Sequence, residues 1–284
     1  MADVRVVERD VRDTLGEGLF WSAGEDALYW TDILAPALNR LSLATGAVQR
    51  WPMPEMIGWV IERERGGLIA GFKSGFAELS LDPVRVQPIV DPEPNEPANR
   101  MNDAKADRWG NIWAGTMPVA IDRPSGGLYR LGRDRRVQRF DSGYTVANGP
   151  AISPDGRWLY HTDSPARTIY RFSLSEEGVR DRALFLRFEE EWGVPDGMTC
   201  DADGGLWVAH WGGGRVSRFT PDARIDRAIK LPASQITNVC FAGAALDRMF
   251  VTSAADGKAD EPLAGALFEV DPGCRGLPPH RFAG

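Results

Sequence analysis

The sequence predicts an all-β fold, and three observations indicate it. No stretch of about twelve residues keeps the 3.6-residue apolar spacing of an amphipathic helix. The 31 Gly and 20 Pro suit many turns between short strands, and the ten Trp suit packing on pleated surfaces. The third observation is a repeat, in which a polar residue, a Pro/Gly/Asp turn and a short apolar strand follow one another. A period of about 40–50 residues with several short strands is typical of a β-propeller blade.

Six copies of this repeat follow one another along the chain. The apolar residues at the centres of their strands are Trp30, Ile69, Trp113, Tyr160, Trp207 and Phe250, at intervals of 39, 44, 47, 47 and 43 residues. A further strand follows each of them, from LNRLSLA in the first copy to GALFEVD in the last. Six such units fill the chain, so the sequence predicts one domain, residues 1–284, folded as a six-bladed β-propeller.

The ends and joints of the repeats have their own signals. The N-terminal stretch VRVVERDV alternates polar and apolar residues, and we expect it to pair with the C-terminal GALFEV strand and close the ring. The stretch DPEPNEPA, Asp91 to Ala98, predicts a linker between blades two and three because proline prevents regular structure. The pairs Gly66-Gly67, Asp155-Gly156 and Asp203-Gly204 predict hairpin turns.

Composition narrows the classes of partner. A net charge of −7 without a Lys/Arg cluster argues against nucleic-acid binding. The chain has no run of eighteen apolar residues, so we expect no membrane span. The start, MADVRVVERDV, is too charged for a signal peptide, and Cys200, Cys240 and Cys274 lack metal-type spacing. We therefore expect three reduced thiols in a cytoplasmic protein; the sequence leaves the oligomeric state open.

A polar residue opens five of the six repeats at nearly the same distance, 11 to 13 residues, before the aligned strand residue. These residues are Glu17, Asn102, Asn148, Asp196 and Asn238, and Gly58 and Trp59 stand at the matching place in the second repeat. Residues at the same position in each repeat of a ring of blades lie at the same height along the axis of the ring. We therefore expect these side chains to converge on one mouth of the central channel. Carboxylate and amide oxygens suit calcium, magnesium or manganese, and zinc less exclusively.

Each of these residues also has an ordinary structural explanation. Asn148-Gly149 and Asp196-Gly197 are common turn dipeptides, Glu17 could be a solvated charge, and Asn102 could hold a loop. The shared phase favours a ligand set over these separate explanations.

The histidines offer weaker candidates. His161 and His210 lie within or beside apolar strands, and each is expected to be a packed side chain. Of the two, His210 is the better pocket candidate because Trp211 and three glycines follow it.

Four strings, LGEGLFW, RMNDAKADRWGNIWAGTM, NGPAISPDGRWLYHTDS and VPDGMTCDADGGLWVAHWGGGRVSRF, carry a resemblance to a known family. Nearly the whole chain resembles the gluconolactonase/regucalcin family, also called the senescence-marker-protein and luciferin-regenerating-enzyme family. The resemblance implies a six-bladed propeller with one catalytic divalent metal ion (calcium, zinc, manganese, magnesium or iron) in the channel mouth. It implies Glu17, Asn148 and Asp196 as metal ligands, Arg100 and Asn102 as substrate contacts, and Asp196 as general base.

The implied reaction is hydrolysis of a sugar-acid lactone such as a glucono-, xylono- or arabinono-lactone. Family members carry a longer loop after AGTM, with an acidic residue that reaches the sugar. Here the loop is the short PVAIDRPSGG, in which Asp122 or Arg123 is the candidate replacement, so the identity of the sugar stays open.

The chemistry of lactone opening fits these residue types. A divalent metal can polarise the ester carbonyl as a Lewis acid, and Arg100 and Asn102 can orient the ring. Asp196 would then serve as both ligand and base; alternatively, the metal lowers the pKa of the attacking water. The absence of a G-x-S-x-G motif and the presence of only three His argue against a covalent serine route.

Two other functions compete with the lactonase. One is a phosphotriester or aryl-ester hydrolase that uses the same metal, and the other is a non-catalytic propeller that binds calcium or a protein partner. An organophosphate pocket should be more apolar than a sugar pocket, and a scaffold needs no carboxylates in phase beside Arg100.

Overall fold

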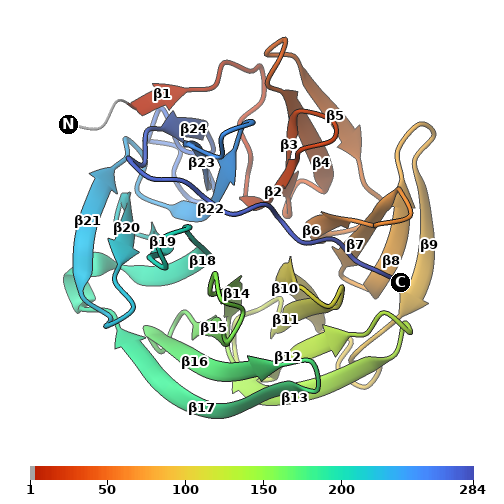
Figure 1. Cartoon of the computed structure of the whole chain (residues 1–284). Coiled ribbons are helices and arrows are strands. Elements are labelled where there is room, and N and C mark those ends of the chain that lie inside the picture. The colour runs from red at the N-terminus through yellow and green to blue at the C-terminus, as the bar shows by residue number, and fades with distance from the viewer. Residues whose placement is uncertain (1–3) are drawn as a thin grey trace.

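Six four-stranded antiparallel sheets stand around a central channel in the computed structural model, which describes residues 4–284 (Figure 1). The predicted six-bladed β-propeller is therefore confirmed; the first three residues of the predicted range 1–284 lie outside the described residues. Within residues 4–284 the only helical element is a 3₁₀ turn, η1 (Glu190–Trp192). None of these residues belongs to a helix that is long and apolar enough to cross a membrane.

Each blade runs from an inner strand at the channel to an outer strand at the rim. Blades 1 and 2 contain β2 (Gly16–Ser22), β3 (Ala27–Asp32), β4 (Ala37–Ser42) and β5 (Val48–Pro52), then β6 (Ile57–Glu62), β7 (Leu68–Phe72), β8 (Gly75–Ser80) and β9 (Arg85–Val90). Blades 3 and 4 contain β10 (Asn99–Ala106), β11 (Ile112–Pro118), β12 (Gly126–Leu131) and β13 (Val137–Tyr144), then β14 (Ala147–Ile152), β15 (Trp158–Asp163), β16 (Thr168–Ser175) and β17 (Gly178–Arg187). Blades 5 and 6 contain β18 (Val194–Cys200), β19 (Leu206–Trp211), β20 (Arg215–Phe219) and β21 (Ile225–Lys230), then β22 (Ile236–Ala242), β23 (Arg248–Ser253), β24 (Leu267–Val270) and β1 (Val4–Val6).

The N-terminal strand closes the ring as predicted. β1 pairs antiparallel with β24, with Val4 opposite Val270 and Val6 opposite Phe268, and so becomes the outer strand of blade 6. The last blade is thus built from both ends of the chain, which covers a strand edge that would otherwise be free to pair. The predicted linker 91–98 contains no strand, and the three predicted glycine turns each lie between two strands of one blade.

The core lies between neighbouring blades. The six residues on which the repeats align are all buried, with exposed fractions of 0% to 3%. In blades 3 and 5 the turn after the inner strand adds a polar anchor to this packing. The carboxylate of Asp107 accepts a hydrogen bond from the indole N–H of Trp113 at 2.9 Å, and Asp201 does the same for Trp207 at 2.8 Å. These bonds satisfy an indole donor that burial would otherwise leave without a partner.

Every inner strand carries an irregularity at the same level. The pairing with the second strand of the blade shifts register after Glu17, Ile57, Met101, Asn148, Pro195 and Ile236. In five of the six blades two residues of the inner strand then face one residue of its partner, as in a β-bulge. A bulge breaks the alternation of side chains, so residues whose offsets differ by one can point the same way. This explains why polar residues 11, 12 and 13 positions before the aligned residue share one height.

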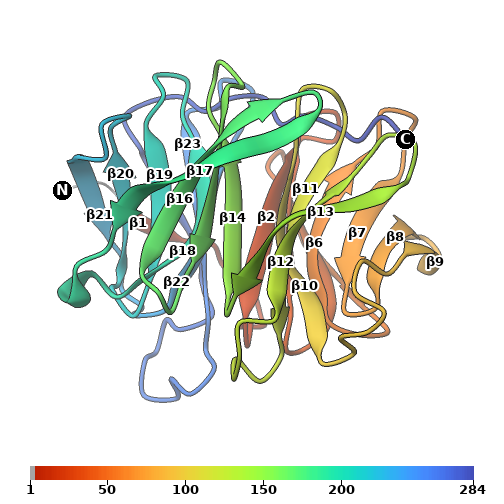
Figure 2. The same cartoon turned by 90° about the horizontal axis from the view of Figure 1, so that it is seen from below.

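The C-terminal segment crosses the face at which the inner strands end (Figures 1 and 2). At one end the backbone of Arg275 accepts a hydrogen bond from Ala202 N at 2.8 Å. At the other end Phe282 N donates to Glu62 O at 2.9 Å, and the Phe282 side chain is fully buried between blades 2 and 3 beside Trp59. The segment therefore ties blade 5 to blades 2 and 3 across one end of the channel.

The anchor at Phe282 should matter for stability. We expect Phe282→Ala to lower the free energy of unfolding by about 3–5 kcal/mol, because truncation of a buried aromatic loses apolar burial and leaves a cavity. Urea unfolding followed by circular dichroism measures this. The matched control is Leu184→Ala, at a large apolar residue that is 59% exposed, where the change should stay within about 0.5 kcal/mol. Equal effects of the two substitutions would show that the C-terminal segment contributes nothing to the stability of the ring.

Candidate active site in the central channel

The polar residues at the bulges meet inside the channel. Glu17, Asn102, Asp103, Asn148, Asp196 and Asn238 come from five different blades, and each is only 3% to 6% exposed. Hydrogen bonds across blades join Glu17, Asn238 and Asp103 in one group and Asn102 and Asn148 in another, and Asp196 lies close enough to Glu17 and Asp103 for their charges to interact. The structure thus brings together all the predicted site residues and adds Asp103, which follows Asn102 in the bulge of β10.

Asn238 bridges two of the carboxylates. Its Nδ2 donates to Glu17 Oε2 at 2.9 Å and to Asp103 Oδ2 at 3.3 Å, while its Oδ1 accepts from Val239 N at 2.8 Å. Glu17 also accepts from Gly18 N at 3.1 Å. The amide of Asn238 thus presents its donor to the channel, and in this arrangement it positions acids and is not itself an oxygen ligand.

A second network fixes the amide of Asn148. The hydroxyl of Ser164 donates to Pro195 O at 2.6 Å, so it can accept at its oxygen from Asn148 Nδ2 at 2.9 Å. With its nitrogen engaged there, Asn148 turns Oδ1 towards Asn102, whose Nδ2 donates to it at 2.7 Å. The amide oxygen has a second lone pair, which is free for a ligand in the channel.

Burial dominates the electrostatics of the three acids. It raises the pKa of Glu17 to about 7, and the neighbouring charge of Asp103 adds to this effect. Burial also raises the pKa of Asp103 to about 6. The pKa of Asp196 is raised well above its ordinary value by burial, and then by the charges of Glu17 and Asp103. Arg100 is the counter-charge here, and burial lowers its pKa to about 10 against the pull of Glu17 and Asp196, so it stays protonated at neutral pH.

This donor set fits a divalent cation. Two carboxylates, Glu17 and Asp196, and the amide oxygen of Asn148 offer hard oxygen ligands. Two cations act on the three buried acids: Arg100 interacts with Glu17 and Asp196, and Lys105 with Asp103. A divalent cation would neutralise the remaining negative charge. Among residues 4–284, no three His, Cys, Asp or Glu side chains are arranged to hold a metal ion by themselves. A site built here therefore depends on the amide oxygen of Asn148 as well as on the acids.

Arg100 has donors to spare for a further ligand. Its Nη1 donates to Met101 O at 3.0 Å and to Asn102 Oδ1 at 2.6 Å. Its Nε and Nη2 make no hydrogen bond to any residue from 4 to 284, although the side chain is only 7% exposed. Asn102, by contrast, uses both amide hydrogens, on Ala147 O and on Asn148 Oδ1, each at 2.7 Å. In this structure Asn102 orients its neighbours, and Arg100 is the group with free donors.

A cavity of about 200 Å³ lies over Arg100 on the face where the inner strands begin. Its polar lining includes Lys73, Glu93, Glu96, Asn99, Arg100 and Thr116. The linker 91–98 forms one wall of this cavity, and Glu93 anchors it. The Glu93 carboxylate accepts from Asn99 Nδ2 at 2.8 Å, Thr116 Oγ1 at 2.9 Å and the Tyr129 hydroxyl at 2.7 Å. The sequence identified this stretch only as a linker; the acidic residues within it were the available signal.

The loop after AGTM contributes less to the cavity than the sequence suggested. Asp122 and Arg123, the candidate replacements for the family's acidic residue, do not line it. Arg123 instead pairs with Glu96 at 3.1 Å, where both side chains are nearly half exposed, and Asp122 lies 4.0 Å from Arg123. The acidic groups in the cavity lining come instead from the linker 91–98, which lies just before β10 in the chain.

His210 is not a pocket residue, which corrects the preference stated above. It is fully buried in blade 5, where its ring lies 4.6 Å from that of Phe188 and its Nδ1 is 2.8 Å from Trp192 O. Strand alternation turns it away from the channel into the packing between elements. His161 is likewise fully buried, edge-on to Tyr144 at 4.6 Å. The expectation that both are packed side chains is confirmed.

The fold and the channel define the class of protein: a six-bladed propeller with an oxygen-rich site on its axis. The chain belongs to the SMP-30/Gluconolactonase/LRE-like family, whose model matches residues 15–255. The family that the sequence resembled is thereby confirmed.

Three relatives illustrate the likeness. The chain is 37% identical to a 6-deoxy-6-sulfogluconolactonase from Pseudomonas putida, over 92% of this chain and 93% of the relative. It is 35% identical to the pentonolactonase XacC from Haloferax volcanii, over 99% and 98% of the two chains. Among solved structures, a calcium-binding protein, regucalcin, from Agrobacterium tumefaciens is similar with a TM-score of 0.91 and 26% identity, over 99% and 98% of the chains.

The raised pKa values predict an unusual dependence of stability on pH when divalent cations are removed by chelation. The pKa of Glu17 is 4.5 in the unfolded chain and about 7 in the folded protein. Between these pH values the folded state therefore holds a proton that the unfolded state has lost. The contribution of Glu17 to stability is therefore present below about pH 4.5 and disappears as the pH rises through about 7.

Melting temperatures of the chelated protein, measured across this pH range, check the prediction. We expect the Glu17→Gln variant to gain melting temperature relative to wild type as the pH rises, because glutamine does not ionise. The control is Glu64→Gln, at an exposed glutamate, which should parallel wild type. If the difference between wild type and Glu17→Gln were constant from pH 4 to pH 8, Glu17 would not be a buried acid with a raised pKa.

Proposed function

We propose that the protein is a metal-dependent lactonase that opens the ester ring of a sugar-acid lactone by attack of water. The observation that carries this proposal is the juxtaposition of two buried carboxylates, Glu17 and Asp196, with Arg100, whose side chain lines a polar cavity. Membership of the family supports it, as do the relatives named as a sulfogluconolactonase and a pentonolactonase.

The metal site is the first part of the proposal. Glu17, Asn148 and Asp196 would hold one divalent cation, and the same acids and amide accept calcium, magnesium, manganese or, less exclusively, zinc and iron. When bound, such a cation supplies Lewis-acid polarisation of the lactone carbonyl. The similarity to a structure described as a calcium-binding protein supports calcium among these metals.

Residues of the chain itself would bind the lactone and accept the proton. Arg100 would donate from Nε and Nη2 to the oxygens of the lactone, and Asn102 would hold the guanidinium in place through the 2.6 Å bond to Nη1. Asp196 would accept the proton of the attacking water, since burial and its acidic neighbours make its carboxylate a stronger base than an exposed one. Charge-assisted donors fixed in a buried site lose little on reorganisation during the reaction.

The polarity of the cavity favours a sugar lactone over the competing ester substrates. Its lining includes Lys73, Glu96 and Arg100, which offer hydrogen-bond partners for ring hydroxyls. A ligand with an apolar surface there would leave the free donors of the buried Arg100 unpaired, at a cost of about 1–3 kcal/mol.

A panel of aldonolactones tests the proposal. Acid release would be followed on glucono-, xylono- and arabinono-lactone after chelation and after re-addition of calcium, magnesium, manganese, zinc or iron. We expect turnover of at least one lactone, its loss on chelation and its return with one or more metals. No lactone turnover with any metal, together with hydrolysis of a phosphotriester or aryl ester, would replace the proposal by the competing hydrolase.

The role of Arg100 can be tested separately from the metal. We expect Arg100→Ala to lower kcat/KM on the best lactone by roughly tenfold or more, because loss of a charged hydrogen bond to a buried ligand costs about 1.5–3 kcal/mol. Metal affinity, measured by calorimetry, should not fall. Arg123→Ala, at the exposed rim, is the control and should leave the kinetics near wild type. Unchanged kinetics for Arg100→Ala would make Arg100 a structural residue.

Two isosteric variants separate the base from a simple ligand. Asp196→Asn keeps the shape and one oxygen but removes the basicity, so activity should fall by roughly 10²–10⁴ and excess metal should not restore it. Glu17→Gln should weaken metal binding first, and excess metal should then partly restore activity. Rates measured against metal concentration distinguish the two. Rescue of Asp196→Asn to near wild-type turnover would show that Asp196 is a ligand only and that another group takes the proton.

A further inference from the structure

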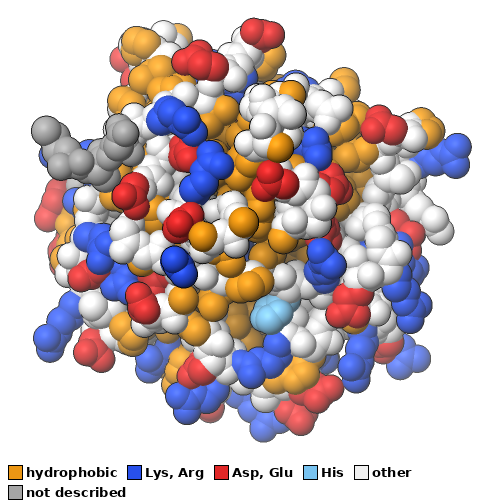
Figure 3. Space-filling view, turned by 45° about the horizontal axis from the view of Figure 1, so that its top comes forward, with side chains coloured by type: hydrophobic (Ala, Val, Ile, Leu, Met, Phe, Trp, Pro, Cys, Tyr) orange, Lys and Arg blue, Asp and Glu red, His pale blue; other side chains and the backbone are white. Residues whose placement is uncertain are grey.

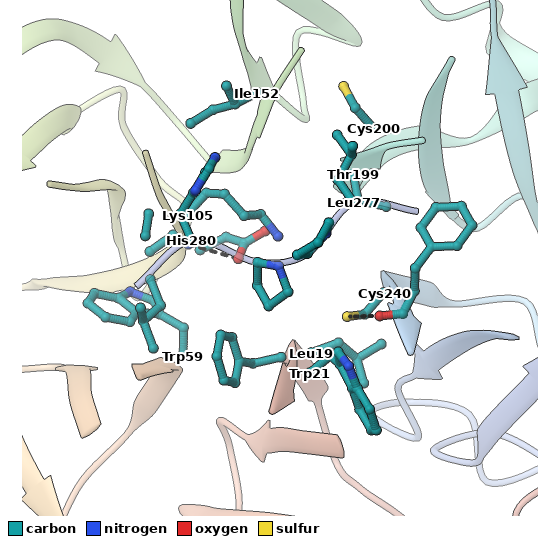
Figure 4. A pocket seen from close by; sticks show the side chains of 18 of the residues that line it. Leu19, Trp21, Trp59, Lys105, Ile152, Thr199, Cys200, Cys240, Leu277 and His280 are labelled. Carbon is teal, nitrogen blue, oxygen red and sulfur yellow. Dashed lines mark hydrogen bonds between the residues drawn. The ribbon is translucent and has the colours of Figure 1, made fainter. Parts of the chain in front are cut away.

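A second and larger cavity, of about 290 Å³, lies at the opposite end of the channel from the one over Arg100. The later halves of the inner strands form its walls, and residues 277–280 of the C-terminal segment cross it (Figure 4). Its lining includes Leu19, Trp21, Trp59, Lys105, Cys240 and Phe241. We refer to it as the distal cavity. Asp103 is the residue that it shares with the acidic site described above.

The walls of the distal cavity are mainly apolar. Trp21 and Trp59, on the inner strands of blades 1 and 2, line it with side chains that are nearly fully buried in the cores between blades. The apolar side chains of Ile152 and Leu277 keep part of their surface exposed beside the cavity. Figure 3 shows apolar side chains near the centre of the face above them. A volume near 300 Å³ with such walls and a few polar groups is typical of a site for a small organic molecule. A polyhydroxy lactone would find few hydrogen-bond partners on these walls.

Lys105 gives the distal cavity a positive charge. It lies on β10 two residues after Asp103, is half-buried and extends into the cavity (Figure 4). Its ammonium forms no ion pair with any carboxylate in the described chain, although 20 ion pairs are formed elsewhere. The nearby Asp103 accepts hydrogen bonds from Ala104 N and Asn238 and interacts with Lys105 only through its charge, and Arg108 at the rim bonds to Asp155 O. The cation available to a ligand is therefore Lys105.

The roof of the cavity is fixed at its two ends and unbonded between them. Arg275 and Phe282 make backbone hydrogen bonds to blades 5 and 2, whereas residues 277–281 make none with the rest of residues 4–284. Pro278 and Pro279 have no N–H to donate, so this stretch lies over the cavity without a strand partner. An apolar ligand beneath it would meet Leu277 and the proline rings without breaking a backbone bond.

We propose that the distal cavity binds a small organic monoanion, with a carboxylate on Lys105 and an aromatic or aliphatic body against Ile152 and Leu277. The site is separate from the proposed lactonase chemistry, because Arg100 and its polar cavity lie at the other end of the channel. A half-buried ammonium with no carboxylate within ion-pair distance favours a ligand that brings a negative charge, and the apolar side chains around it favour an apolar body.

Fluorine NMR of the full-length protein with 4-fluorophenylacetate tests the proposal. We expect saturable binding that is roughly tenfold or more tighter than that of the neutral 4-fluorophenylacetamide, the usual effect of a charge-assisted bond. In Lys105→Met the carboxylate should lose this advantage, so that both probes bind alike. The matched control is Lys230→Met, at an exposed lysine of the outer strand β21, which should retain the wild-type preference.

Two further measurements locate the bound probe and define which results contradict the proposal. Excess aldonolactone and the Arg100→Ala variant should both leave probe binding unchanged; displacement by the lactone would place the probe in the other cavity and overturn the proposal. Absence of saturable binding, or equal affinity of wild type for acid and amide, would overturn it without any variant. None of these readouts requires turnover, so the proposal and the lactonase function can fail independently.

Discussion

Burial of three carboxylates in the channel is the constraint on which the rest of the site depends. Glu17, Asp103 and Asp196 are each only 5% to 6% exposed, so their charges must be met by protein donors, by protons or by a cation. Asn238 donates hydrogen bonds to two of the acids, and the positive charges of Arg100 and Lys105 act on them. Burial, and then repulsion between the acids, raises the pKa values of Glu17 and Asp196, and the same buried negative charge suits the channel to a divalent metal.

The propeller gives its two channel ends opposite chemistry. The inner strands begin at a face where the linker 91–98 forms one wall of a polar cavity. They end at a face where the C-terminal segment covers apolar walls and one lysine. The strand ladder is regular through both halves and irregular only at the bulges between them. An inner strand can therefore present polar groups at the bulge and, as in β2, β6 and β22, packed rings after it.

Part of the site could be predicted from the sequence, because residues at the same position in each repeat of a propeller lie at the same height along the channel axis. Glu17, Asn102, Asn148 and Asp196 could be grouped in this way without knowledge of a single contact. The grouping could not tell a ligand from a residue that positions one, and Asn102 and Asn238 prove to be held by hydrogen bonds to their neighbours. The prediction that His210 is the better pocket candidate was wrong, because the glycines after it do not indicate on which side of the strand its ring lies.

The sequence by itself determined the all-β class, the six repeats, the closure by the N-terminal strand and the level of the polar ring, because these depend on periodicity and local turn chemistry. Only the tertiary structure decided that every inner strand bulges at one level, that Glu93 joins the mouth from a linker, and that the C-terminal segment covers the far end. Those features rest on contacts between residues far apart in the chain. Burial, which sets the charge balance of the acids and leaves Lys105 beside apolar walls, is likewise a property of the closed ring and not of any segment.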